Sequence, residues 1–596
     1  MDYQSLSSLT AMFFAQAARL DERPLLWRKR EGQWQSLSWR AVAQAVRHMA
    51  QGLRAAGLQN GARVLLVSES RPEWLIADLA IMAAGGITVP AYTTNTAADH
   101  LHLLNNSGAS MVIVSSRALV EKVIHAGLKA EHPPLLIVIE ELALRQNPGL
   151  EVRHWSDLMA QGAAADPAPL PEAARTDTAC IIYTSGTGGA PKGVMLSHGA
   201  ILSNCQGAHR LLEEIGLADN EIFLSFLPLS HAYEHTAGQF FPLSIGAQIY
   251  YAEGLEQLAA NMAEVRPTIM TAVPRLYEMI RGRVLKGVAK SGGLKAWLFQ
   301  RALLLGGRRV EGRLSLPARL ENALLDRLVR RKVALRFGGR LKALVSGGAP
   351  LNYDVGLFFT ALGVRILQGY GQTEAAPLIS CNPPRRVKLK SVGPAVHGVE
   401  LRIAADGEIC VRGELVMQGY WNDAEATRAV LHDGWLHTGD IGHVDEDGYI
   451  HITDRKKDIL VNSGGDNVSP QRIEGLLTLQ PEIAQAMAYG DRRPHLVALL
   501  VPDADEAAAW AAARGLPTAL GQLIENRDFR AHISQAVDRV NQVLAQHERI
   551  RRMLLTADPF TVDNGMSTPT LKIRRHVIVA RYGEALAALY EERKGG

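Results

Sequence analysis

Apolar runs alternate with amphipathic segments along the first 200 residues. The segment 38–57 repeats its apolar residues at the three-to-four-residue spacing of a helix. Short apolar runs bounded by polar or turn residues predict buried strands at 62–70, 109–116, 134–141 and 178–186. This alternation predicts an α/β architecture with largely parallel sheets.

The most apolar long stretch runs from Trp74 to Ala91. It contains Asp78, two glycines and Pro90, and it is shorter than the uninterrupted apolar run that a membrane-spanning helix needs. We therefore expect a buried helix, a turn and a strand there. The first residues lack a basic segment before an apolar run, so no secretory signal is expected.

The chain of 596 residues is too long for a single hydrophobic core. The segment 162–177 is rich in Ala and Pro and predicts an exposed connector. After residue 450 the pattern changes to a strand, a charged turn and a second strand, followed by alternating helices and strands. We expect a large domain at 1–453 and a small C-terminal domain at 454–596.

Charge is unevenly distributed. The net charge is +4, but residues 281–342 hold 17 Lys and Arg against three Asp and Glu, so this basic insertion carries +14 and the rest carries −10. Such a block suits an anionic surface, membrane or nucleic acid, and the alternative is a set of solvated helix faces. The cations expected to face such a surface include Arg308, Arg309, Arg330, Arg331 and Lys332.

The four cysteines form no CxxC pair, which favours a reducing compartment.

Residues 183–193 are the most informative segment. Three hydroxyl residues, four glycines and one lysine follow an apolar strand within eleven positions. Glycines let backbone N–H groups approach an anion, and hydroxyls and lysine add donors and charge, so the segment suits polyphosphate binding. Lys192 precedes Gly193 rather than Ser or Thr, which excludes the Walker pattern. The alternative is a flexible surface loop.

The residue order YTSGTGGAPKGVMLSH resembles the phosphate loop of the adenylate-forming superfamily, which includes AMP-forming acyl-CoA synthetases. Gly188 departs from the second Thr that is usual there. The resemblance implies that ATP phosphates contact Thr184, Ser185, Gly186, Thr187, Gly189 and Lys192.

Further motifs of the superfamily follow in order. SGGAPL (346–351) resembles the loop that lines the adenine pocket, and QGYGQTE (368–374) resembles the next nucleotide motif. The resemblance implies that Tyr370 stacks on adenine, Thr373 contacts phosphate, and Glu374 holds Mg²⁺ together with Thr184. The nucleotide-contacting residues implied by these two motifs are Gly347, Gly348, Ala349, Gln368, Gly369, Tyr370, Gly371 and Thr373.

Four segments supply the remaining implied site residues. By resemblance, Asp440 in GWLHTGDIG accepts hydrogen bonds from both ribose hydroxyls, and Arg455 lies near the ribose. DRKKDIL (454–460) resembles an interdomain hinge with Asp454 as its pivot, and Lys572 matches the catalytic lysine. His231 lies in a motif beside the acyl and thiol sites, where a direct role and a core histidine are both open.

The resemblance implies stacked, mainly parallel sheets with helices in the large domain and a small mobile α+β C-terminal domain. It also implies two half-reactions, in which a carboxylate and ATP give acyl-AMP and pyrophosphate before coenzyme A displaces AMP. The His231 motif, Gln372-Thr373-Glu374 and the basic insertion are similar to the long-chain fatty acid:CoA ligase branch.

A carrier protein as acceptor, another hydrophobic carboxylate and a catalytically weak binding protein are the alternatives. We expect a cytoplasmic protein with peripheral contact to the inner face of an anionic membrane, and no nucleic-acid partner.

Overall fold

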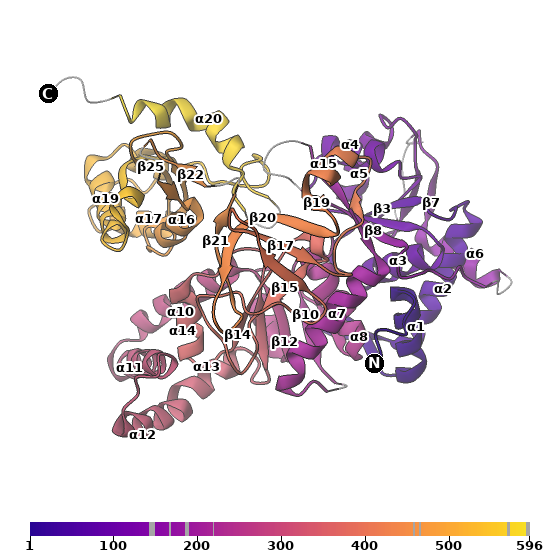
Figure 1. Ribbon diagram of the computed structural model, residues 1–596, viewed down its shortest axis with the longest axis horizontal. Helices are drawn as coiled ribbons and strands as arrows, with labels where there is room; N and C mark the ends of the chain where they lie inside the picture. Colours follow the sequence, from indigo (N-terminus) through magenta and orange to yellow (C-terminus); the bar gives the residue numbers. More distant parts are fainter. Residues whose placement is uncertain are drawn as a thin grey trace.

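The computed structural model describes residues 1–591 except 142–148, 166–168, 185–189, 219, 457–458, 464–465 and 569–571. A large body contains two eight-stranded sheets and a third, antiparallel sheet, and a smaller C-terminal body lies beside it (Figure 1).

The first sheet contains the strands that the sequence predicts before residue 190. Strands β8, β4, β3, β5, β6 and β7 are parallel, and β9 and β18 add antiparallel pairs at one edge. In sheet order the strands are β18 (Gly419–Tyr420), β9 (Lys192–Ser197), β8 (Thr178–Thr184), β4 (Ile87–Ala91), β3 (Arg63–Val67), β5 (Met111–Val114), β6 (Leu135–Val138) and β7 (Val152–His154).

The second sheet is also mainly parallel, with one antiparallel strand at each edge. In sheet order the strands are β15 (Leu378–Cys381), β14 (Ile366–Gly371), β13 (Ala343–Ser346), β12 (Ile269–Ala272), β10 (Ile222–Ser225), β11 (Gln248–Tyr251), β1 (Pro24–Arg30) and β2 (Gln33–Ser38). Both sheets therefore confirm the predicted parallel α/β architecture.

The largest core joins the facing sides of these two sheets. It includes apolar side chains of α1 (Leu9–Leu20), α2 (Trp39–Ala55), α3 (Pro72–Ala83) and α7 (His198–Leu212). Every residue of α3 except Glu73 is buried, so the apolar stretch from Trp74 is a core helix followed by β4, as predicted.

Helices also cover the outer faces of both sheets, which explains why their strands are apolar on both sides. The first sheet packs on α4 (Ala97–Ser107) and α5 (Arg117–Gly127), while α6 (Trp155–Ala164) packs on α2. The second sheet packs on helices of the basic region and its neighbours. These are α9 (Leu258–Val265), α10 (Pro274–Ser291), α11 (Gly293–Val310), α12 (Leu316–Leu325), α13 (Arg331–Arg336) and α14 (Tyr353–Ala361).

The third sheet is antiparallel and leads into the C-terminal body. Its strands are β16 (Glu400–Ile403), β17 (Glu408–Arg412), β20 (Trp435–Val444) and β19 (Leu431–His432), with β21 (Ile450–Arg455) paired to β20. The helix α15 (Ala424–Val430) and a two-stranded ladder of β22 (Leu460–Val461) and β23 (Asn467–Val468) complete this region.

The C-terminal body has its own sheet of β24 (Ile483–Tyr489), β25 (Leu496–Pro502) and β26 (Ile550–Leu555). Alternate residues of β25 enter two separate cores, with Leu500 in one and Leu499 in the other. The surrounding helices are α16 (Pro470–Leu477), α17 (Ala504–Ala512), α18 (Leu520–Leu523), α19 (Arg527–Asn541) and α20 (Arg575–Ala588).

Arg330 corrects the expectation that its cation faces a surface. Its side chain is buried, and its guanidinium donates to the backbone carbonyls of Ala302 and Ala361 and to Asn322. The basic composition of residues 281–342 predicts that this arginine is exposed like its neighbours. In the structure its buried side chain instead joins α11, α12 and α14 by hydrogen bonds.

In the described residues, no helix is both long and apolar enough to cross a membrane.

Candidate active site

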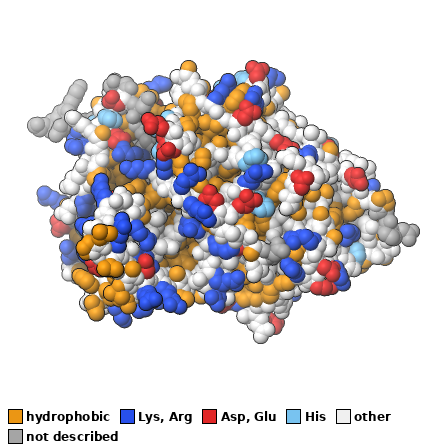
Figure 2. Space-filling model, turned by 60° about the horizontal axis from the view of Figure 1, so that its bottom comes forward, with side chains coloured by type: hydrophobic (Ala, Val, Ile, Leu, Met, Phe, Trp, Pro, Cys, Tyr) orange, Lys and Arg blue, Asp and Glu red, His pale blue; other side chains and the backbone are white. Residues whose placement is uncertain are grey.

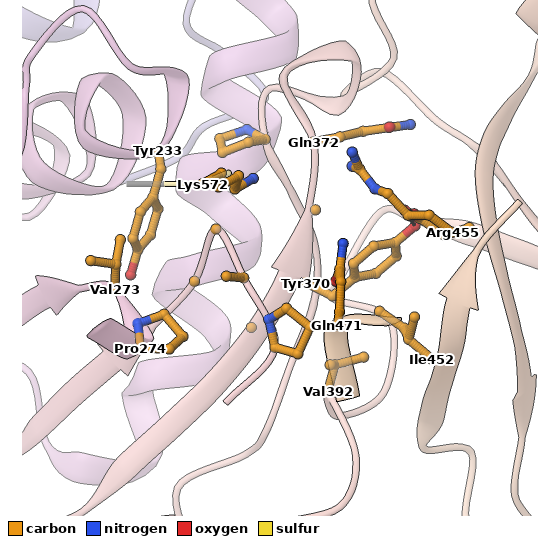
Figure 3. A pocket seen from close by; sticks show the side chains of 18 of the residues that line it. Tyr233, Val273, Pro274, Tyr370, Gln372, Val392, Ile452, Arg455, Gln471 and Lys572 are labelled. Atoms are coloured by element: carbon orange, nitrogen blue, oxygen red, sulfur yellow. Dashed lines mark hydrogen bonds and ion pairs between the residues drawn. The ribbon is translucent and has the colours of Figure 1, made fainter. Parts of the chain in front are cut away.

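A cavity of about 2270 Å³ opens where the large body, the third sheet and the C-terminal body meet. Figure 3 shows Tyr370, Arg455 and Lys572 among its lining side chains. Every predicted site residue that the structure describes lines this cavity: Thr184, Lys192, His231, Gly347, Gly348, Ala349, Gln368, Gly369, Tyr370, Gly371, Thr373, Glu374, Asp440, Arg455 and Lys572. Ser185, Gly186, Thr187, Gly188 and Gly189 lie outside the described residues.

The predicted phosphate loop joins two antiparallel strands at the cavity. β8 ends at Thr184 and β9 begins at Lys192, and these two residues are direct partners in the ladder. The hairpin therefore places a hydroxyl and an ammonium side by side where the cavity begins. The Lys192 amine lies 5.1 Å from the centre of the Tyr420 ring, a cation–π contact, and 3.7 Å from an Asp423 carboxylate oxygen.

Tyr420 links this hairpin to the predicted magnesium ligand. Its hydroxyl donates to Oε1 of Glu374 at 2.9 Å, and its strand β18 pairs with β9 beside Lys192. Burial and the Glu374 charge raise the pKa of Tyr420 well above its usual value, so the phenol remains a donor. The sequence interpretation missed Tyr420, because a strand pairing across more than 200 residues brings it here.

Asp440 is the meeting point of two predicted nucleotide-binding segments. Asp440 is only 3% exposed. Its Oδ2 accepts a hydrogen bond from the Tyr370 hydroxyl at 2.7 Å, and its Oδ1 accepts one from Nε of Arg455 at 3.0 Å. Asp440 and Arg455 are partners in the β20–β21 ladder. Burial and the Asp440 charge raise the pKa of Tyr370, so this phenol also stays protonated.

Two glycines shape the predicted adenine loop after β13. A Cβ on Gly347 would lie 3.0 Å from the Tyr233 ring, and Gly348 has φ +81°, a conformation that favours glycine. The Tyr233 hydroxyl donates to the Val345 carbonyl at 2.8 Å and so fixes its ring against this loop.

His231 and Lys572 face the same part of the cavity from different bodies. Nδ1 of His231 accepts a hydrogen bond from the Tyr233 N–H at 3.1 Å, so the neutral ring carries its proton on Nε2. Burial, and then the positive charge of Lys572, lower the pKa of His231 to about 3. The ring is therefore neutral at physiological pH and available as a hydrogen-bond donor.

Two hydrogen bonds join Thr568 and Lys572. The Thr568 N–H donates to the Lys572 carbonyl at 2.8 Å, and the Lys572 N–H donates to the Thr568 hydroxyl at 3.0 Å. The lysine side chain lines the cavity from the C-terminal body (Figure 3).

Comparison with known families identifies this arrangement. Residues 13–421 match the model of the AMP-binding enzyme family. The chain belongs to this family. Residues 457–594 match the model of the AMP-binding enzyme C-terminal domain, which includes Lys572.

Relatives of this AMP-binding enzyme have similar length. A long-chain-fatty-acid–CoA ligase of Mycobacterium bovis is 34% identical over 574 residues, covering 94% of this chain and 93% of the relative. A peroxisomal long chain acyl-CoA synthetase of Arabidopsis thaliana is 31% identical over 587 residues, covering 94% and 82%.

Solved structures share its fold. The A domain of a carboxylic acid reductase from Segniliparus rugosus, solved with AMP and a co-purified carboxylic acid, superposes with a TM-score of 0.79 at 21% identity. The match covers 99% of this chain and 95% of that one.

The AMP-binding enzyme also offers oxygen donors of the kind that Mg²⁺ prefers. Glu374 and Thr184 line the same cavity, and no group of three or more His, Cys, Asp and Glu able to hold a metal occurs among the described residues. A single carboxylate supplemented by substrate phosphates is typical of Mg²⁺ bound with a nucleotide, so the donor set fits this ion.

Part of the cavity lining is apolar. It comes from α7, the second sheet and the segments that flank His231, and includes Ala208, Leu211, Leu212, Phe223, Leu227, Phe241 and Ile269. A hydrocarbon chain would bury its surface favourably against these side chains.

Proposed function

We propose that this chain is an AMP-forming long-chain fatty acyl-CoA synthetase. It activates a fatty acid with ATP to acyl-AMP and pyrophosphate, and then transfers the acyl group to the thiol of coenzyme A. The observation that carries this proposal is the 34% identity, over 94% of the chain, to a long-chain-fatty-acid–CoA ligase. The apolar part of the cavity lining supports a fatty acid as the carboxylate.

The catalytic roles follow from positions around the cavity. Lys572 stabilises the negative charge that builds on phosphoryl oxygens as the fatty-acid carboxylate attacks the α-phosphate, and the hairpin from Thr184 to Lys192 holds the leaving pyrophosphate. Glu374 and Thr184 are the residues that would hold Mg²⁺, which neutralises phosphate charge when bound. Tyr420 orients the Glu374 carboxylate by its hydrogen bond.

A second group of cavity residues holds the nucleoside. Tyr370 provides an aromatic face for adenine beside the loop of Gly347, Gly348 and Ala349. Asp440 accepts hydrogen bonds from the ribose hydroxyls, and Arg455 orients that carboxylate by its own hydrogen bond. The remaining contacts proposed for the nucleotide are those of Ser185, Gly186, Thr187, Gly189, Gln368, Gly369, Gly371 and Thr373.

His231 positions the reacting carboxylate rather than moving its proton. With its pKa at about 3, the ring stays neutral in the physiological range, and its Nε2–H can donate to a carboxylate or acyl-phosphate oxygen. We therefore propose a direct contact of His231 with substrate and not a role as a cationic general acid near pH 7.

The two half-reactions require two placements of the C-terminal domain. We assign the large domain to 1–453 and the small lid domain to 454–596, with Asp454 as pivot at the end of β21. The separate cores of the C-terminal body support its movement as a unit. Lys572 then leaves the cavity before the coenzyme A thiol attacks.

Peripheral contact with an anionic membrane belongs to the same proposal. The net charge of +14 in residues 281–342 supports it. The four cysteines are free and buried, which supports a reducing compartment, so the inner face of a membrane is the proposed location.

A panel of carboxylates tests the function. The proposal predicts fatty-acid-dependent release of pyrophosphate, and acyl-CoA and AMP when coenzyme A is added. Replacing coenzyme A with carrier protein distinguishes the alternative acceptor, and a preference for aromatic or short carboxylates would contradict the fatty-acid assignment. If no carboxylate in the panel caused pyrophosphate release, the alternative of a catalytically weak binding protein would be favoured.

A further inference from the structure

The outer face of α11 is apolar as well as basic. Leu294, Trp297 and Leu304 follow a helical spacing that places them on one side, and they are 70%, 58% and 47% exposed. Phe299 and Leu305 of the same helix are buried in the core beneath the second sheet. The helix therefore has two apolar faces, and only one of them is covered by this chain.

The next helix continues this surface. Leu316, Leu320 and Leu324 recur every four residues along α12 and are 74%, 79% and 57% exposed, and Leu328 extends the stripe into the following turn. More than half of the large apolar side chains that are exposed in the described part of the chain lie between residues 294 and 335. A patch of this kind on a folded protein marks an interaction surface.

The two helices are fixed to each other before any partner arrives. Arg301 on α11 makes a bidentate ion pair with Glu321 on α12, at 2.6 and 2.8 Å. Beneath them the buried Arg330 donates to the carbonyls of Ala302 and Ala361 and so ties both helices to α14. The exposed leucines and Trp297 therefore project from a preformed platform.

Cations border the apolar stripe. Figure 2 shows apolar and basic side chains gathered at the lower left, over the region of α11 and α12 in Figure 1. Within the described ranges, the exposed cations of this region that have no ion-pair partner include Lys290, Lys295, Arg308, Arg319, Arg327, Arg331, Lys332 and Arg336.

We infer that this face of α11 and α12 docks on an anionic lipid bilayer, with its leucines and Trp297 inserted at the boundary between headgroups and acyl chains. Mixed apolar and cationic side chains on one helix face are typical of interfacial membrane contact. Lysine and arginine at the rim then lie at the level of the lipid phosphates, where each contributes attraction. This inference rests on the membrane contact proposed above and adds the surface that makes it, which lies outside the cavity and can be tested without the ligase reaction.

Charge complementarity selects this occupant over two others. A second copy of the chain would bring two strongly basic faces together, which is unfavourable. The phosphates of coenzyme A would satisfy the cations but would leave the leucine stripe in water. An anionic bilayer provides phosphates for the cations and an apolar interior for the leucine stripe.

Vesicle co-sedimentation of the full-length protein without substrates tests the inference. Phosphatidylcholine vesicles containing phosphatidylglycerol should bind the wild type in a salt-sensitive manner, and pure phosphatidylcholine vesicles should not. The double variant Arg319→Glu/Leu320→Ser should bind at least about tenfold more weakly. The matched control is Leu128→Ser/Lys129→Glu, an exposed leucine and lysine beyond α5, at the far side of the molecule in Figure 1, and it should bind like the wild type.

A second measurement locates Trp297. Trp297→Leu keeps an apolar side chain, so it should retain most vesicle binding, but quenching of tryptophan fluorescence by brominated lipids should fall. Equal vesicle binding by the wild type and the α12 double variant would overturn the inference. So would a raised KM for coenzyme A with unchanged vesicle binding, or a wild-type dimer that the double variant converts to monomer.

Discussion

Asp440 and Arg455 face each other across β20 and β21, with Oδ1 of Asp440 3.0 Å from Nε of Arg455. The other oxygen of the same carboxylate accepts the Tyr370 hydroxyl. Tyr370 and Arg455, which are 85 positions apart in the chain, thus share one buried carboxylate. These two hydrogen bonds fix the orientation of the Asp440 carboxylate, as a ribose-binding carboxylate requires.

Asp440→Ala should raise the KM for ATP by one to two orders of magnitude, about the loss expected when two hydroxyls lose a charged acceptor. Calorimetric titration with ATP checks binding directly. Asp447→Ala, at an exposed turn between the same two strands, is the control and should leave ATP affinity unchanged. Unaltered ATP binding by a folded Asp440→Ala variant would remove the ribose assignment.

Lys572→Ala should slow acyl-AMP formation by roughly two to three orders of magnitude, because one electrostatic donor to the transition state is lost. Single-turnover assays can compare adenylation with thioester formation from preformed acyl-AMP. The second half-reaction should change little, since the lysine then lies away from the phosphate. An equal loss in both half-reactions would be inconsistent with the role proposed for Lys572.

Glu234 provides a test of pH dependence. It is fully buried in a π-helical turn (Glu234–Phe240) beside His231, and accepts hydrogen bonds from Ser225 and Thr271. Burial raises its pKa to about 7. The folded state therefore retains the Glu234 proton at pH values where the unfolded chain has lost it. As a result, the contribution of the protonated Glu234 to the free energy of unfolding falls as pH rises from about 4.5 to 7.

Glu234→Gln should remove that dependence, which amounts to about 3 kcal/mol across the window. Urea unfolding at a series of pH values checks it. The variant should gain stability relative to wild type as pH rises, and parallel curves for the two proteins would show that Glu234 is ionised throughout.

Arg330 and Arg331 are adjacent cations with opposite environments. Arg330→Ala should destabilise the fold by about 3 kcal/mol, because buried carbonyl groups lose their donor. Arg331 is exposed, so Arg331→Ala should change the free energy of unfolding by less than about 0.5 kcal/mol. Chemical denaturation of the two variants compares them, and equal stabilities would refute the structural role of Arg330.

The strands and nucleotide motifs could be predicted because their information is local. β3, β5, β6 and β8 are short apolar runs bounded by turns, and each motif is one contiguous segment of the chain. Tyr420 could not be found in this way, because only the pairing of β18 with β9 brings it to Glu374.

The sequence also does not show which side chains of the basic region are exposed and which are buried. The helical periodicity of α11 reveals two apolar faces, but the contact with α14 decides which one is buried. For the same reason, the sequence predicts an exposed Arg330. Composition does not reveal which arginine donates hydrogen bonds to the carbonyls of Ala302 and Ala361.

The central claim is that a fatty-acid carboxylate attacks the α-phosphate of ATP in this cavity. The most direct measurement follows ¹⁸O from a long-chain fatty acid labelled in its carboxyl group, incubated with ATP, coenzyme A and the enzyme. Attack at the α-phosphate forms a bond between carboxylate oxygen and phosphorus, and thiolysis then leaves that oxygen on AMP. The account predicts one ¹⁸O atom in the AMP phosphate and none in pyrophosphate, whereas label in inorganic phosphate with release of ADP would contradict it.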